Sequence, residues 1–91
     1  MQLAVRCEDF TNTFAVNSTS VWFTAMAFLK LLDEGNKRRG GLGVSSQVVV
    51  TSSIAGFNKS APGGWAYGPS KAAATHIAKM LSVVLPTWGI R

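Results

Sequence analysis

The sequence predicts an α/β fold with the order helix, strand, helix, and three segments lead to this prediction. Apolar residues recur with a helical period over about residues 8–34, and a second helical segment covers about residues 65–85. Between them, residues 47–53 form a short β-branched run that is typical of a strand buried on both faces of a parallel sheet. One strand cannot form a sheet, so we expect this strand to belong to a parallel sheet that contains further strands.

The first predicted helix, over about residues 8–34, carries a stripe of mostly apolar side chains. They follow one another at spacings of three or four residues, which places them on one helical face. The stripe consists of Phe10, Phe14, Asn17, Val21, Ala25, Phe28 and Leu32. Gly35 is predicted to stop this helix, and the Gly-rich, basic segment 35–46 is predicted to be a long connection.

The second predicted helix, over about residues 65–85, starts beside Tyr67 and Lys71 and is stopped by Pro86. Because they are four residues apart, Tyr67 and Lys71 share a helical face. A free phenol has a pKa of about 10, and a nearby cation lowers the pKa of such a group by on the order of 1 to 3 units. Tyr67 is therefore a candidate acid or base near neutral pH.

Ser52 and Ser53 stand at the end of the predicted strand, directly before the Gly- and Pro-containing loop 57–65. A serine at such a position can donate a hydrogen bond to an oxygen on which charge develops. The commoner meaning of a Ser-Ser pair is a polar strand terminus, and the residues alone leave both interpretations open.

Three segments occur in a fixed order along the chain: AVNSTSVWF (15–23), SSIAG (52–56) and YGPSK (67–71). In these three segments the sequence resembles the short-chain dehydrogenase/reductase family. Among the subgroups of that family, it most resembles the 3-oxoacyl-acyl-carrier-protein reductase-like subgroup. The resemblance covers about residues 8–91 but only the middle of a family member. It implies a partial Rossmann-type doubly wound parallel sheet that lacks the first strands and the C-terminal part, so we expect a fragment or a truncated gene product.

The resemblance implies catalytic roles for four residues. Tyr67 would give or take the hydroxyl proton, and Lys71 would lower the pKa of Tyr67 and, with it, hold the nicotinamide ribose. Ser53 would polarise the carbonyl, although it lies fourteen residues before Tyr67, one more than is usual in the family, so Ser52 is the alternative. Asn17 would hold a water in the proton path, whereas the simpler interpretation is that its amide bonds to neighbouring backbone.

The activity implied in this way is the interconversion of a ketone and a secondary alcohol, with NADP or NAD as cofactor and a small carbonyl or alcohol compound as substrate. The 91 residues contain neither a Gly-rich phosphate loop after a first strand nor the acidic residue that selects the ribose. Enzymatic activity of this chain therefore stays open. The alternative is a catalytically silent remnant that acts through association with full-length relatives.

Composition argues against several other functions. The formal net charge is +5, but the basic cluster 37–39 has no aromatic residues interleaved with it, so nucleic-acid binding is not expected. No apolar run approaches the roughly 20 residues of a membrane-spanning helix, and no signal-peptide core is visible, which makes a cytoplasmic protein the expectation. The single Cys7 cannot form an internal disulfide, and no metal site is predicted.

Hydrophobic residues make up 47% of the chain and charged residues 14%, which is rather apolar for so small a domain. Several apolar side chains lie outside the predicted core stripe, and exposed apolar patches mark interaction sites. These residues are Trp22, Phe23, Met26, Leu29, Ile77, Met80 and Val84. The family resemblance implies that the two helices pair with their symmetry mates, so we expect the complete protein to be a dimer or tetramer.

Overall fold

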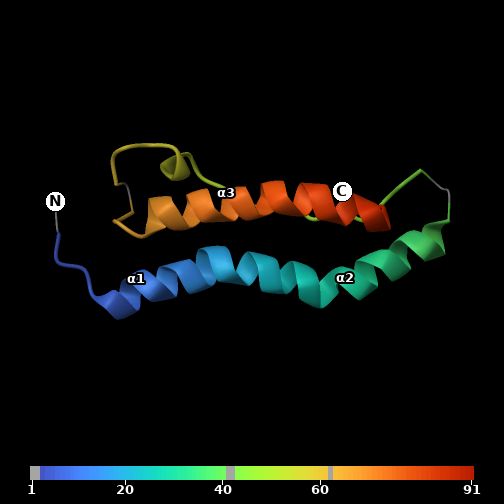
Figure 1. Ribbon diagram of the computed structural model, residues 1–91, viewed down its shortest axis with the longest axis horizontal. Helices are drawn as coiled ribbons and strands as arrows, with labels where there is room; N and C mark the ends of the chain where they lie inside the picture. The colour runs from blue at the N-terminus through green and yellow to red at the C-terminus, as the bar shows by residue number, and fades with distance from the viewer. Residues whose placement is uncertain (1–2, 41–42, 62) are drawn as a thin grey trace.

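Two long helical arms lie side by side along the molecule, with the connecting segments at their ends and along the second arm (Figure 1). This computed structural model describes residues 3–40, 43–61 and 63–91. Positions 41, 42 and 62, which belong to the two predicted loops, lie outside the described residues. The principal extents are 53 × 23 × 16 Å, so the molecule is too thin to enclose a deep core.

The first arm is helical from Cys7 to Arg39 but contains one wide turn. It consists of α1 (Cys7–Phe14), a π-helical turn (Ala15–Thr19) and α2 (Ser20–Arg39). The wide turn falls where Asn, Ser and Thr residues weaken the intrinsic preference for an α-helix. Because a π turn contains more residues than an α turn, it rotates the faces of α2 relative to those of α1.

The prediction that Gly35 stops the first helix is wrong, since α2 continues for one further turn. Lys37 supports that turn through ion pairs with Asp33 (3.3 Å) and Glu34 (3.9 Å), and three basic residues in the last turn complement the helix dipole. The helix ends instead at Gly40, which adopts the left-handed conformation with φ 37°.

The second arm is α3 (Tyr67–Val84), where a helix over about residues 65–85 was predicted. It leads into a 3-10 turn, Leu85–Trp88. α3 packs directly on the first arm, and the buried cluster between them comprises Ala25, Leu81, Leu85 and Ile90. Within the described ranges, none of the helices combines the length and the hydropathy that crossing a membrane requires.

The core on α2 coincides with the predicted stripe only in part: Ala25 is buried in the cluster and Leu32 packs against it. Trp22, Met26, Leu29 and Ile77, which we expected to be left over, pack against the buried cluster. Phe28, from the predicted core stripe, is 53% exposed. The physical reason is that α2 packs on α3 through one side, while the predicted stripe borders an open pocket beside residues 47–51.

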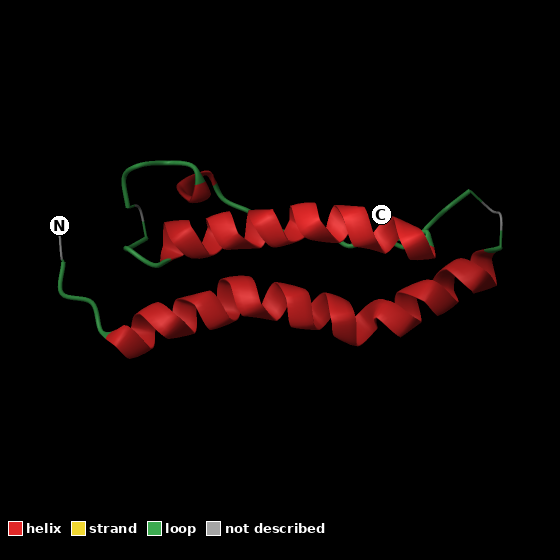
Figure 2. Cartoon of the chain, in the orientation of Figure 1, coloured by secondary structure: helices red, strands yellow, loops and turns green. Residues whose placement is uncertain are grey.

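The predicted strand is not confirmed, because no strand is assigned anywhere in residues 3–40, 43–61 and 63–91 (Figure 2). A strand needs a partner along its length, and among the described residues Arg91 alone pairs with residues 46–48. Val48 N–H donates to the Arg91 carbonyl (2.7 Å), and Arg91 N–H donates to the Ser46 carbonyl (3.0 Å). This alternation is the hydrogen-bond pattern of two parallel strands, but Arg91 is the last residue of the sequence and the pairing goes no further.

A polar cluster around Asn36 fixes the start of this extended segment. The side-chain Oδ1 of Asn36 accepts from Ser46 N–H (2.7 Å), and its side-chain Nδ2 donates to the carbonyls of Trp88 (3.0 Å) and Gly89 (3.1 Å). Arg39 donates to the hydroxyl of Ser46 (2.6 Å). One side chain on α2 therefore holds both the segment that leads to residue 47 and the turn that follows α3.

We expect Asn36→Ala to lower the free energy of unfolding of the 91-residue chain by about 1–3 kcal/mol, because the buried Ser46 N–H loses its partner. Asn12→Ala is the matched control, since Asn12 is an exposed helical residue of α1. Chemical denaturation followed by circular dichroism measures both. Equal stability of the two variants would show that the cluster contributes nothing.

Candidate functional site

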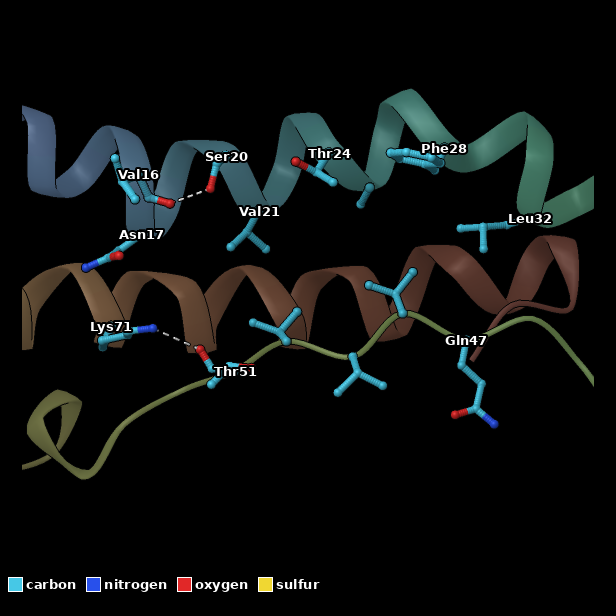
Figure 3. Close-up of a pocket in the computed structure, with 14 residues that line it drawn as sticks. Val16, Asn17, Ser20, Val21, Thr24, Phe28, Leu32, Gln47, Thr51 and Lys71 are labelled. Atoms are coloured by element: carbon cyan, nitrogen blue, oxygen red, sulfur yellow. Dashed lines mark hydrogen bonds between the residues drawn. The ribbon is translucent and has the colours of Figure 1, made fainter.

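A pocket of about 420 Å³ lies between the first arm and residues 47–51. α2 forms one wall of this pocket, and the extended segment forms the other (Figure 3). Asn17, from the π turn, and Lys71, from α3, lie at the same end of the pocket in this view. Two of the four predicted site residues therefore border one cavity, whereas Ser53 and Tyr67 are not among the residues that line it.

Lys71 lies one helical turn after Tyr67, and its ammonium group approaches the phenol ring. The distance from Lys71 Nζ to the centre of the Tyr67 ring is 5.9 Å. The same nitrogen donates a hydrogen bond to the Thr51 carbonyl at 3.2 Å, which ties the lysine head to the end of the extended segment (Figure 3). An ammonium has three N–H donors, so two are left for other acceptors.

Tyr67 is half-buried at the first position of α3. The preceding loop approaches its ring closely at Gly63, where a Cβ atom would lie 3.2 Å from Tyr67 Cγ and Cδ2. Gly63 also has φ +85°, a conformation that side chains disfavour. In the described part of the chain, no hydrogen bond is made by the Tyr67 hydroxyl.

The two adjacent serines form different hydrogen bonds. Ser53 caps the short 3-10 helix η2 (Ile54–Gly56), where its hydroxyl oxygen accepts from Ala55 N–H at 3.1 Å. Its own proton is still available for donation. Ser52 is instead hydrogen-bonded to the Thr75 hydroxyl on α3. Among the described residues, neither serine is hydrogen-bonded to Tyr67 or Lys71.

Asn17 is tied to the first turn of α3 by its side chain. Its amide donates to the Ser70 hydroxyl (3.1 Å), which in turn donates to the Tyr67 carbonyl (2.7 Å). Ser70 has no exposed surface, and Ser18 donates to its carbonyl (2.8 Å). The observed partner of the Asn17 amide is thus a buried serine rather than neighbouring backbone, and its role toward a water stays a prediction.

Two glycines let the turn that begins at Ser53 lie directly on α3. A Cβ atom on Gly68 would lie 2.7 Å from the Ala55 carbonyl oxygen, and one on Gly56 would lie 3.0 Å from Ala72 N. Contacts this short are possible only without a side chain. The pair of glycines therefore sets how close the turn η2 and its capping serine come to the helix that carries Tyr67.

Sequence reasoning missed three residues that contact this site: Thr51, Ser70 and Thr75. The spacing of four residues between Lys71 and Thr75 would have placed them on one helical face. It gives no indication of the partners Ser52 and Thr51, because those come from a segment about twenty residues away in the chain. Metal binding is not indicated, since no described group of His, Cys, Asp or Glu residues is placed to hold an ion.

Comparison with known proteins identifies the family to which these residues correspond. The whole chain, residues 1–91, matches the family described as short chain dehydrogenase. It is 42% identical, over 96% of its length, to short-chain dehydrogenase/reductase SAT3 of Stachybotrys chartarum, of which it covers 36%. It is 43% identical, over 90% of its length, to PhomF of Diaporthe leptostromiformis, of which it covers 28%.

A third relative, VdtF of Byssochlamys spectabilis, is 40% identical over 91% of the chain, which covers 32% of that protein. Both PhomF and VdtF also bear the name short-chain dehydrogenase/reductase. The chain thus spans about a third of the length of the curated relatives it matches. No solved structure matches it significantly.

We expect Gly68→Ala to destabilise the 91-residue chain by about 1–3 kcal/mol, because the new methyl group meets a backbone carbonyl that cannot rotate away. Gly35→Ala is the control: it also lies inside a helix, but its methyl group would meet the ends of the Ser46 and Arg39 side chains at 3.3–3.5 Å. Alanine is the better helix former, so the control should be neutral or stabilising. Thermal unfolding compares the two, and a stabilised Gly68→Ala chain would contradict the close contact.

Proposed function

The chain belongs to the short-chain dehydrogenase family, and we propose that it carries the catalytic residues of an NAD(P)-dependent oxidoreductase that interconverts a ketone and a secondary alcohol. The observation that carries this proposal is the pairing of Tyr67 with Lys71 at the start of α3, with 5.9 Å between the ammonium and the ring centre. Within the family, the proposal extends to the 3-oxoacyl-acyl-carrier-protein reductase-like subgroup, which the sequence resembles most.

Tyr67 is the proposed acid and base. In the reduction, its hydroxyl donates a proton to the carbonyl oxygen; in the oxidation, its phenolate accepts the proton of the substrate hydroxyl. The Lys71 ammonium lies 5.9 Å from the centre of the Tyr67 ring, and its bond to the Thr51 carbonyl holds it in place. Acid–base assistance of this kind contributes roughly 10²- to 10⁴-fold to the rate. A nicotinamide cofactor, when bound, supplies or accepts the hydride.

Ser53 is the proposed donor to the substrate oxygen. Its oxygen already accepts from Ala55 N–H, which directs the remaining hydroxyl proton away from the turn and makes it available to a developing oxyanion. Ser52 is the weaker candidate, because its hydroxyl is occupied by Thr75. Asn17 borders the same pocket as Lys71 and would hold a water between that lysine and solvent.

The residues present fit one end of a nicotinamide cofactor. Two N–H donors of Lys71 remain free of the bond to Thr51, and together with the Tyr67 hydroxyl they suit the paired hydroxyls of a ribose. No Gly-rich loop after a strand occurs in the 91 residues; Gly40 and Gly43 precede the extended segment rather than follow it. The proposal therefore assigns the ribose contacts to this chain, with NADP or NAD as the cofactor.

A second candidate, a catalytically silent remnant that associates with full-length relatives, is favoured by one observation. Residues 46–48 pair with Arg91 alone, and Val49 beside them is 84% exposed. An extended, exposed apolar segment can accept a strand from another chain. Saturable binding of NADPH or NADH to the 91-residue chain separates the two, because only the enzyme proposal expects it.

We also propose that the complete protein forms a homo-oligomer and lies in the cytoplasm. The support for assembly is that α2 and α3 both expose large apolar side chains: Phe23 is 65% exposed, Met80 50% and Val83 78%. Apolar surface of this kind on neighbouring helices is typical of a self-complementary interface.

We expect Tyr67→Phe to abolish turnover while leaving cofactor binding almost unchanged, because it removes one hydroxyl and little volume. Lys71→Ala should impair both. The assembled enzyme for this test is the full-length gene product or, where that is the 91-residue chain, the Stachybotrys chartarum relative with residues 1–91 in place of its matching segment. Nicotinamide absorbance with a panel of ketones and secondary alcohols measures turnover. A Tyr67→Phe enzyme that retains most activity would overturn the mechanism.

We expect the double variant Phe23→Glu with Met80→Glu to shift the assembled enzyme from dimer or tetramer to monomer, since both side chains are exposed on the helices proposed to associate. Leu3→Glu is the control, because Leu3 is 77% exposed and precedes both helices. Light scattering at micromolar concentration measures the mass. A monomeric parent enzyme, or an unchanged mass in the double variant, would contradict the proposed interface.

A further inference from the structure

A chain of three oxygen atoms connects the serine pair to α3. Thr75 Oγ1 donates to the Lys71 carbonyl at 3.0 Å, which uses its one proton. The hydrogen bond between Ser52 and Thr75 must therefore have Ser52 as its donor and Thr75 as its acceptor. The Thr75 hydroxyl thus acts as both a donor and an acceptor. The proton of the Ser52 hydroxyl is engaged in this bond and is not available to a substrate oxygen.

This bond also fixes which way the next side chain points. Ser53 has φ −153° and ψ 148°, an extended backbone. In an extended chain, successive side chains point to opposite sides, so holding Ser52 toward α3 directs Ser53 away from the Thr75 hydroxyl. The two serines are chemically identical and adjacent, and their different bonds distinguish them.

We propose that Thr75 is a positioning residue that selects Ser53, rather than Ser52, as the hydroxyl offered to the reacting carbonyl. The inference rests on the proposed function, since it concerns the same site. Thr75 acts through Ser52 and does not itself touch substrate. Without its hydroxyl, Ser52 regains a free proton, the segment loses a bond to α3, and the two serines compete for the same role.

The neighbouring contacts explain why this one bond is decisive. The Lys71 bond to the Thr51 carbonyl fixes the backbone just before the serine pair, and the close approach of Gly56 to Ala72 fixes it just after. Both contacts act on backbone atoms and neither distinguishes the side chains of Ser52 and Ser53. In the described chain, the side-chain bond to Thr75 is what ties one particular serine to the helix.

The test uses the assembled enzyme defined above and compares Thr75→Val with Thr75→Ser. Valine keeps the branched shape of threonine without the hydroxyl, whereas serine keeps the hydroxyl. We expect Thr75→Val to lower kcat about tenfold with little change in KM, the effect of losing one ordinary hydrogen bond that favours the productive arrangement. Thr75→Ser should restore kcat. Thr87→Val is the matched control, because Thr87 is exposed in the turn after α3.

A second readout separates positioning from general stability. Ser53→Ala should cost less activity in the Thr75→Val background than in the parent enzyme, because Ser52 can then serve in its place. A merely structural Thr75 would leave the Ser53→Ala effect the same in both backgrounds, and that result would overturn the proposal.

Ser52→Ala breaks the same bond but also removes the competing hydroxyl, so it should lose less kcat than Thr75→Val. An equal loss in the two variants would mean that the bond only holds the segment, and that result would overturn the selection of Ser53. If Thr75→Val does not fold, Thr75→Ala takes its place in this comparison. Tyr67→Phe serves as the reference: if it remains active, the proposed function fails. If Tyr67→Phe is inactive while Thr75→Val turns over like the parent, only the positioning role fails.

Discussion

The close packing of the turn Ile54–Gly56 on the first turns of α3 is the constraint on which the rest of the site depends. It is possible because Gly68 presents no side chain to the Ala55 carbonyl and Gly56 presents none to Ala72. With the turn held there, the end of the extended segment runs along α3, and the Thr51 carbonyl comes within reach of Lys71. The position of the lysine head beside Tyr67 follows from a contact between backbone atoms, which side-chain motion cannot easily disturb.

A second set of polar contacts works at the opposite end of the same segment. Asn36 holds Ser46 to α2, and residues 46–48 pair with Arg91. The extended segment is therefore fixed at both ends although it has no strand beside it along most of its length. Its middle, around Val49, is exposed, and the pocket between it and α2 is open. Order at the two ends of the segment therefore does not require a neighbouring strand along its middle.

Local chemistry was predictable from the sequence, and tertiary placement was not. The spacing of Tyr67 and Lys71 gave their shared face, because helix periodicity is a property of the chain itself. The end of α2 was mispredicted because glycine has a low intrinsic preference for helices, which made Gly35 the expected stop. Ion pairs of Lys37 stabilise the additional helical turn that follows Gly35. The core face of α2 was mispredicted in part, because Val21 and Phe28 of the stripe border the open pocket, and the π turn before them shifts their phase relative to α1.

The site separates into a part that is encoded locally and a part that is not. The contacts of Lys71 with Tyr67 and Thr51, and of Ser52 with Thr75, all lie within residues 51–75, and they join α3 to the end of the extended segment. Electrostatic catalysis also needs water to be excluded, because charges and dipoles act more strongly in a low-dielectric site. The pocket that Asn17 and Lys71 border is open, so the arrangement of these side chains in the 91-residue chain does not depend on burial of the pocket.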